Sequence, residues 1–424
     1  MLSDRRPPMQ RRYDLDWVRI AAFFLLVLYH TGMYYVSWDW HVKSPYASET
    51  IEPLMLLTSP WRLSLLFLVS GAATAFLFGK RPAGFVRQRS RRLLLPLIFG
   101  MLVVVAPQSY YEVVEKLPGG YHDGHAAFWV RYLQNDPDFC RDGECLDVPT
   151  WNHLWFVAYL WVYTMIGWAL LRFAPDAMAR VGGWLERRLS GVGALLWPAL
   201  LLAIARLALV ARFESTHALV DDWYNHAQYL PLFLLGMLVA SRDGFWDALQ
   251  RMRWRSLVAA MAGYALIVWY FYASGYSDER TPPPEALRMM QRVVWALLQW
   301  TAIAAIFGFV RGIAFNDSAA LRYLREAVFP VYILHQTIIV VLAHNAQPLG
   351  LRPGIEGPLL VMATFALCFL GFEIVRRVRW IRPLFGLKAS PPARSRPCSA
   401  AFRCDDDGMN EGPTRPSSPG RAGR

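Results

Sequence analysis

The first apolar run of the chain, residues 18–38, has an arginine at its start and a histidine in its middle. Arg19 and His30 are eleven residues apart, so on an α-helix both side chains lie on one face, roughly 16 Å apart along it. Ionisable side chains inside a membrane-spanning helix are costly and usually face a protein interior. Imidazole titrates near neutrality and can accept a proton from an attacking hydroxyl, so we expect His30 to act as a general base. The alternative is that His30 is a hydrogen-bonded packing residue.

Arg19 also has two interpretations. It either contributes to the same site as His30, or it anchors the inner edge of the helix by extending to the lipid headgroups. Asp16 lies one turn earlier on nearly the same face, and we expect these two side chains to pair.

A second group of candidate residues lies in the basic segment 79–96. Six basic residues and no acidic residue occur between Lys80 and Arg92, and the positive-inside rule accounts for part of this charge. Arg89, Arg91 and Arg92 lead directly into the third apolar run. Guanidinium groups bind phosphate in a bidentate way. We therefore expect these three arginines to bind a phosphorylated donor from the cytoplasm.

Four further polar residues are candidates for binding substrate. Ser70 precedes a glycine in the middle of the second apolar run, where small residues usually allow close helix packing. His153 opens the fourth run between two tryptophans, a position that also fits an aromatic belt at the membrane interface. Tyr332 and His335 are one turn apart within a later run. When buried, they must find partners in the protein or in the substrate.

Two isolated arginines also require an explanation. Arg62 begins the second apolar run at its outer end, where it is either an interfacial anchor or a ligand for a molecule outside. Arg206 lies within an otherwise apolar run, and a buried cation there needs a counter-charge. Glu373 is too close to Arg376 and Arg377 to be proposed as that partner.

The elements that position these residues are long and apolar. The chain has 424 residues, of which 55% are hydrophobic and only 18% charged. Soluble domains have fewer apolar and more charged residues. We therefore expect an all-α, polytopic integral membrane protein with about ten transmembrane helices. The expected helices are 17–37, 61–79, 93–112, 153–172, 192–211, 226–241, 256–275, 289–310, 326–345 and 357–376.

The charge of the connecting segments alternates along the chain. The N-terminus and the segments 80–92, 172–190, 241–255 and 311–325 together contain 21 Lys and Arg against 8 Asp and Glu. The segments 38–53, 115–150, 212–224 and 276–288 contain 7 against 16. Basic loops stay in the cytoplasm, so we expect both termini to be cytoplasmic. The net charge of +12 then reflects topology, and we expect no nucleic-acid partner.

The expected organisation has three parts. Residues 1–16 form a cytoplasmic N-terminal segment, residues 17–388 a membrane domain with a periplasmic loop at about 113–152, and residues 389–424 a disordered cytoplasmic tail rich in Pro, Ser, Gly and Arg. Cys140 and Cys145 in the loop are expected to be a small disulfide or free thiols, with a weak metal pair as the alternative. No nucleotide-binding loop and no HExxH zinc motif occurs in the sequence, and we expect no metal.

Five segments, in this order, resemble the membrane acyltransferase-3 family. They are the Arg-x10-His spacing within DLDWVRIAAFFLLVLYH, then SPWRLSLLFLVSG, RQRSRRLLLP, HLWFVAYLW and VYILHQ. The resemblance extends from about Tyr13 to Arg382. The start of the chain and the HLWF segment are most similar to the branch that contains glucan biosynthesis protein C, a succinyltransferase acting on periplasmic glucans. Many family members have an aromatic residue after Ser-Gly, whereas this chain has Ala72.

The resemblance implies an enzyme of the bacterial inner membrane that transfers an acyl group, acetyl or succinyl, from cytoplasmic acyl-CoA to a carbohydrate hydroxyl. By position, Arg19 and His30 match the family's essential pair. Arg89 and Arg92 match its inner Arg-x-x-Arg element, which is associated with the donor. The expected partners are acyl-CoA as co-substrate, a carbohydrate acceptor such as a glucan, and the lipid bilayer, with no permanently bound cofactor.

Two other classes of protein fit part of the pattern. Proton-coupled secondary transporters also place His and Arg inside polytopic helices, but the sequence has no inverted repeat of the expected kind. A non-catalytic membrane scaffold would leave the Arg19–His30 spacing without a role.

Overall fold

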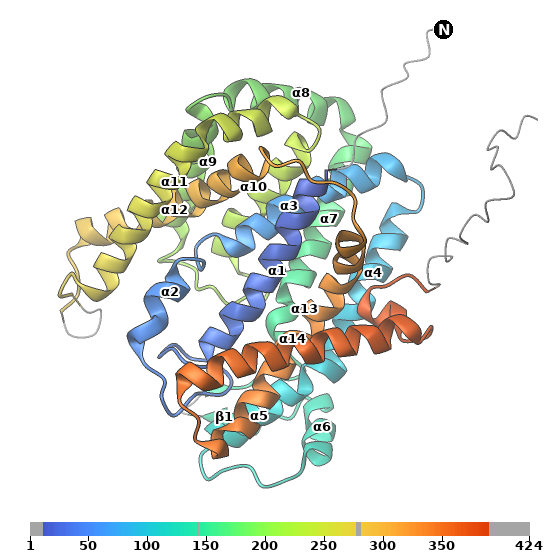
Figure 1. Ribbon diagram of the computed structural model, residues 1–424, viewed down its shortest axis with the longest axis vertical. Coiled ribbons are helices and arrows are strands. Elements are labelled where there is room, and N and C mark those ends of the chain that lie inside the picture. Colours follow the sequence, from blue (N-terminus) through green and yellow to red (C-terminus); the bar gives the residue numbers. More distant parts are fainter. Residues whose placement is uncertain (1–11, 142–143, 277–280, 390–424) are drawn as a thin grey trace, which may run out of the picture. The chain divides into compact units, whose positions relative to one another are not determined.

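The computed structural model describes residues 12–141, 144–276 and 281–389. Within these residues, ten long helical segments occupy the ten predicted positions (Figure 1). They are α1 (Tyr13–Met33), α3 (Arg62–Lys80), α4 to α5 (Phe85–Lys116), α7 (Trp155–Phe173), α9 (Gly193–Leu209), α10 (Trp223–Val239), α11 (Asp243–Tyr272), α12 (Glu285–Val310), α13 (Ala319–Ala346) and α14 (Pro353–Arg377). The all-α prediction is confirmed. The predictions for residues 1–11 and 390–424 lie outside the described residues.

The number of membrane spans is slightly smaller than predicted. In the described part of the chain, eight helices are long and apolar enough to cross a membrane. The short helix α8 (Pro175–Arg188) and α9 together form a ninth candidate, bent by 112°. The remaining helix, α10, has 17 residues, which is at the lower limit of about 17 to 25 residues for a transmembrane helix.

The third span begins earlier than predicted and contains an irregular turn. Between α4 (Phe85–Phe99) and α5 (Ala106–Lys116), the segment η2 (Gly100–Val104) is a π-helical turn. Pro107 follows it and has no N–H to bond a carbonyl of the preceding turn. Side chains from other segments donate to the carbonyls of this turn: Tyr132 to Met101, Trp129 to Leu102 and Thr337 to Val104. The turn is thereby fixed against α13.

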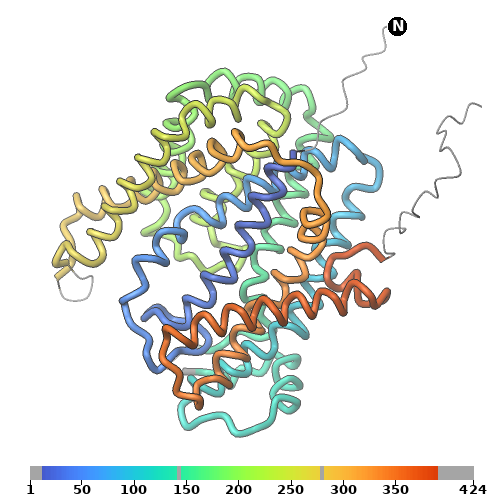
Figure 2. The backbone as a smooth tube through the Cα atoms, in the orientation of Figure 1, coloured from blue at the N-terminus to red at the C-terminus, as the bar shows by residue number. Residues whose placement is uncertain are grey.

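Two pairs of helices show how the bundle is packed. α11 and α12 run side by side (Figure 2). α3 and α10 approach backbone to backbone, because a Cβ on Gly71 would lie 1.8 Å from the carbonyl oxygen of Phe233, and one on Gly236 would lie 2.0 Å from that of Leu68. The close-packing interpretation of the Ser-Gly segment is therefore confirmed. α1 contacts α3, α13 and α14 (Figure 1).

The long outer loop forms a small folded cap. It contains α6 (His125–Leu133), whose Phe128 and Tyr132 are fully buried against Phe139. Strands β1 (Cys140–Arg141) and β2 (Glu144–Cys145) form an antiparallel hairpin. Cys140 and Cys145 are joined by a disulfide, so the disulfide prediction is confirmed and the two alternatives, free thiols and a metal pair, are wrong.

Candidate active site

A strongly basic cavity of about 350 Å³ lies at the N-terminal end of α1, between α3, α4, α7 and α13. We call it the basic cavity. Of the described residues that line it, six are basic and one is acidic. These charged residues are Arg12, Asp16, Arg19, Lys80, Arg89, Arg92 and Arg325.

The arginines of the basic cavity differ in how they are paired. Nη2 of Arg19 lies 3.8 Å from Oδ1 of Asp16, and Nε of Arg325 lies 3.3 Å from Oδ2 of the same carboxylate. The predicted pairing of Asp16 with Arg19 is confirmed. Arg89 and Arg92 have no carboxylate within 4.0 Å among the described residues, and Nε of Arg89 is buried without a hydrogen-bond partner there. The donors of Arg89 and Arg92 are therefore available to an anionic ligand.

A second cavity, of about 380 Å³, lies toward the C-terminal end of α1. We call it the histidine cavity because three histidines line it, His30, His153 and His217. Its wall also has many aromatic side chains: Tyr29, Trp40, Trp155, Phe156, Tyr224, Tyr229, Trp295 and Tyr332. None of the described lining residues is acidic. A cavity of this size and composition is within the range of small-molecule sites, about 300 to 1,000 Å³.

His30 is held by a second histidine from a distant part of the chain. Its Nδ1 lies 2.8 Å from Nε2 of His335, and the two rings are nearly parallel, with an angle of 7° between their planes. Nδ1 of His335 lies 2.6 Å from the carbonyl oxygen of Tyr332. A carbonyl can only accept a hydrogen bond, so Nδ1 of His335 is the donor.

This arrangement assigns the proton positions when both rings are neutral. Nε2 of His335 is then an acceptor, and Nδ1 of His30 donates to it. Nε2 of His30 consequently has a free lone pair, and His30 lines the histidine cavity. That atom has the state required of a general base. His335 is fully buried and is not among the residues that line this cavity. Its position suits orienting His30 better than the direct substrate contact predicted from the sequence.

Tyr332 and His153 complete the group around His30. The hydroxyl of Tyr332 donates to the carbonyl oxygen of His153 at 2.5 Å. Nε2 of His153 donates to the carbonyl oxygen of Ile333 at 3.2 Å. Both side chains are nearly buried and line the histidine cavity. The structure thus brings together three of the four residues predicted to bind substrate, namely His153, Tyr332 and His335.

His153 is in turn contacted by a hydrogen-bonded network of amides and ionisable groups. The sequence did not reveal this network. Gln108, which is fully buried, contacts Nδ1 of His153 at 3.4 Å and accepts a hydrogen bond from Gln336 at 3.1 Å. Gln336 also donates to Nε2 of His41 at 2.8 Å, and His41 donates to Glu112 at 2.5 Å. The only sequence signal is the position of Gln336 immediately after His335.

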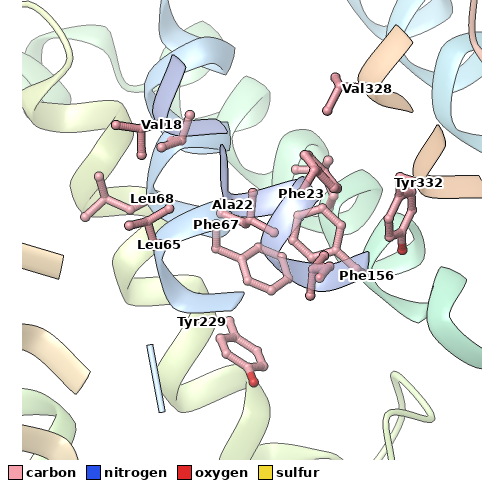
Figure 3. Close-up of a cluster of buried hydrophobic side chains, with 14 of the residues drawn as sticks. Val18, Ala22, Phe23, Leu65, Phe67, Leu68, Phe156, Tyr229, Val328 and Tyr332 are labelled. Carbon is pink, nitrogen blue, oxygen red and sulfur yellow. The ribbon is translucent and has the colours of Figure 1, made fainter. Parts of the chain in front are cut away.

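A layer of aromatic rings separates the two cavities. Phe156 lines both cavities. Its ring centroid lies 6.3 Å from that of Phe23, 6.2 Å from that of Tyr332 and 4.5 Å from that of Phe67. Figure 3 shows these four rings gathered between helices α1, α3, α7 and α13. These rings lie where the two cavities share a wall.

Two predicted site residues lie elsewhere. Ser70 lines the basic cavity and not the histidine cavity. It is therefore on the side of the predicted donor and not beside His30. Arg91 is not among the residues that line the basic cavity, whereas its neighbours Arg89 and Arg92 are. Its role in donor binding remains a prediction.

The two isolated arginines both line the histidine cavity. Arg62 is 7% exposed, so it is a buried residue and not an exposed interfacial anchor. No counter-charge for Arg206 is found among the described residues. Arg206 instead donates to the hydroxyl of Tyr224 and stacks on the ring of Trp295, 4.5 Å from its centroid.

Comparison with known proteins identifies the family of the chain. Residues 12–373 match the acyltransferase-3 family, whose domain is described as an acyltransferase domain. No curated protein and no solved structure gives a significant match. Because the match covers most of the chain, including α1, the basic segment and both cavities, the protein belongs to the acyltransferase-3 family of membrane acyltransferases.

Proposed function

We propose that the protein is an O-acyltransferase that moves an acetyl or succinyl group from cytoplasmic acyl-CoA to a hydroxyl of a cell-envelope carbohydrate such as a glucan. The observation that supports this most strongly is the relation of the two cavities. The basic cavity at one end of α1 and the histidine cavity farther along α1 meet at Phe156. CoA is polyanionic and cannot cross a bilayer, whereas an acyl group is small enough to pass a single layer of rings.

The donor is held at the basic cavity. Arg89 and Arg92 bind the phosphates of CoA, and Arg19 contributes positive charge on the side of α1. The alternation of basic loops supports a cytoplasmic location for this end and a periplasmic location for the histidine cavity. This orientation fits an enzyme of the bacterial inner membrane.

The transfer itself takes place at His30. The acceptor hydroxyl attacks the thioester carbonyl while Nε2 of His30 takes its proton, and a C–O bond forms. The tetrahedral intermediate then collapses, the C–S bond breaks, and the thiolate of CoA takes the proton back from His30. In a two-step variant, Nε2 of His30 first accepts the acyl group and then passes it to the acceptor. Both routes return His30 to its initial state and need no additional reagent.

The test uses the full chain in lipid nanodiscs with radiolabelled acetyl-CoA or succinyl-CoA and a glucan oligosaccharide. We expect His30→Ala to reduce ester formation by about 10²- to 10⁴-fold, the usual contribution of a general base. The protein should still insert and bind CoA. Near-normal transfer by His30→Ala would rule out this assignment. Movement of a solute across vesicles without any requirement for CoA would favour a transporter instead.

The acceptor is identified in cells. Mass spectrometry of envelope glycans from strains with and without the gene should show the loss of one ester. The mass of that ester distinguishes acetyl from succinyl.

A further inference from the structure

Arg62 is a buried cation that has no anionic partner among the described residues. It begins α3, is 7% exposed and lines the histidine cavity. Its guanidinium lies over the ring of Tyr29, 3.3 Å from the ring centroid. Nε and Nη1 are buried and have no hydrogen-bond partner in the described part of the chain. The stacking on Tyr29 uses the flat face of the guanidinium and leaves its in-plane donors free.

Arg206 is a second cation on the wall of the same cavity. It donates one hydrogen bond to Tyr224 and stacks on Trp295, both of which are uncharged. Its Nε is also buried without a hydrogen-bond partner among the described residues. The two arginines come from different helices, α3 and α9, so their presence at one cavity is a consequence of the fold and not of a local charged sequence.

No carboxylate in the neighbourhood compensates these charges. Within the described residues, neither arginine has a carboxylate within the 4.0 Å limit for an ion pair. Asp222 is the buried acid of the adjoining loop, but its oxygens already accept hydrogen bonds from Tyr159, Asn225 and the backbone N–H of His217. Asp222 does not line the cavity.

An uncompensated buried charge is strongly destabilising unless a ligand or solvent pairs with it. Arg62 is buried and Arg206 is half-buried with a buried Nε. Because none of the described lining residues is acidic, these two cations favour an anion as the missing partner. The bidentate donors of a guanidinium match a carboxylate or a phosphate.

We propose that Arg62 and Arg206 form a subsite in the histidine cavity for a carboxylate group of the reacting substrates. This inference rests on the proposed function, because it places the anion beside the acceptor hydroxyl and His30. Two substrates can supply the anion. One is an acidic sugar residue of the acceptor, and the other is the free carboxylate of a dicarboxylic acyl group.

Binding is measured first, because it does not depend on turnover. Glucuronate, succinate and glucose are titrated into the full chain in nanodiscs, with the fluorescence of the cavity tryptophans as the signal. We expect at least one of the two anions to bind about 10- to 100-fold more tightly than glucose, the usual contribution of a hydrogen bond to a charged group. Arg62→Gln combined with Arg206→Gln should remove this preference. Arg212→Gln is the matched control, because Arg212 is exposed and does not line the cavity. Equal binding of all three probes by the unmodified protein overturns the proposal.

Turnover then identifies the source of the anion. Acetyl-CoA and succinyl-CoA are each combined with a neutral glucose oligosaccharide and with one of the same length that contains glucuronate. A rise in KM confined to succinyl-CoA in Arg62→Gln assigns the anion to the acyl group, and a rise confined to the glucuronate acceptor assigns it to the carbohydrate. An equal fall in kcat for all four pairs would mean that Arg62 acts on the reaction centre or on folding, and this too overturns the proposal.

The conservative variants protect the test against simple misfolding. Arg62→Lys and Arg206→Lys keep the charge and should retain part of the anion preference. If these lysine variants are as stable as the unmodified protein but no longer bind anions more tightly than glucose, a charge-based subsite is contradicted. The proposed function has its own test: it is contradicted if the unmodified protein forms no ester. Anion binding can still be measured in that case, so the two proposals can fail independently.

Discussion

The basic cavity and the histidine cavity both contain arginines but hold them in different surroundings. In the basic cavity, Asp16 lies beside Arg19 and Arg325, and the charge is shared among neighbouring side chains. In the histidine cavity, Arg62 and Arg206 lie against aromatic rings and have no carboxylate partner among the described residues. The first arrangement suits a large polyanion bound by many contacts. The second suits a single anionic group.

The two cavities also differ in what they can do chemically. The described residues of the basic cavity include no histidine and no cysteine, so it is equipped to bind. The histidine cavity contains His30, whose free Nε2 follows from the hydrogen bonds of His335. His30 and the arginines of the basic cavity therefore line different cavities, and Phe156 lines both. This separation gives four predictions. Three of them affect one cavity more than the other, and the one at Gly71 affects both.

The largest effect is expected from His335, which lies behind His30. His335→Ala removes the acceptor for Nδ1 of His30, so the imidazole loses both its tautomer and its orientation. We expect kcat to fall by about 100- to 1,000-fold, within the range of general-base contributions, while KM for acyl-CoA stays unchanged. Steady-state kinetics in nanodiscs measures this split. His226→Ala is the control, because His226 is bonded to Tyr163 and Leu219 and lines neither cavity. A parallel rise in the KM for acyl-CoA would mean that the two cavities are not separate in function.

The next effect is expected in the basic cavity. Arg89→Gln and Arg92→Gln each remove a charged donor, worth about 1.5 to 3 kcal/mol, and should raise KM for acyl-CoA by about 10- to 100-fold with little change in kcat. The effect should weaken as salt increases. Arg91→Gln is the matched control, because Arg91 is on the same helix but does not line the cavity. If Arg91→Gln raises KM as much as its neighbours do, the donor site includes the exposed side of α4, as the sequence predicted.

The two cavities also differ in how far the sequence predicted them. Residues 80–92 contain much of the basic cavity's charge in one contiguous segment, so the cavity could be inferred from composition and the positive-inside rule. The ten helices followed from their length and hydropathy. The histidine cavity depends on which helices are neighbours. Hydrophobic periodicity predicts which face of a helix is buried, but it does not predict which other helix packs against that face. His30 and His335 are 305 residues apart, and nothing local predicts their contact.

The same reason explains why the surroundings of Arg206 could not be predicted. Arg206 was expected to need a counter-charge, and its guanidinium stacks on Trp295 from α12, a contact that only the tertiary fold provides. Ser70 was correctly placed in a close-packed segment. Its position in the basic cavity depends on how α3 packs against its neighbours, which the sequence did not reveal.

A smaller effect is expected from the helix that reaches both cavities. α3 contributes Arg62 to the histidine cavity and Lys80 to the basic cavity, and its position depends on contact with α10. In Gly71→Ala, the new Cβ would lie 1.8 Å from the carbonyl oxygen of Phe233, so one backbone must move. We expect a loss of about 1 to 3 kcal/mol of stability, as in other overpacked sites, together with reduced activity in assays of both cavities. Thermal unfolding measures the loss.

The control is Gly357→Ala, whose Cβ would meet its nearest atoms at 3.7 Å or more, and which should leave stability nearly unchanged. If Gly71→Ala impaired only one cavity, α3 would not position the two together.

The smallest expected effect is on the titration of His217, which lines the histidine cavity in the loop before α10. Burial lowers the pKa of His217, the negative charge of Asp222 raises it, and the positive charge of Arg62 lowers it. Arg62→Gln removes a charge that opposes the imidazolium, so the pKa of His217 should rise. Asp222→Asn should lower it. Titration of histidine ring resonances, assigned with His217→Gln, measures both shifts, and Arg89→Gln in the basic cavity should leave the titration unchanged. An unchanged His217 titration in Arg62→Gln would mean that the charge of Arg62 is already neutralised, and the contrast between the two cavities would then disappear.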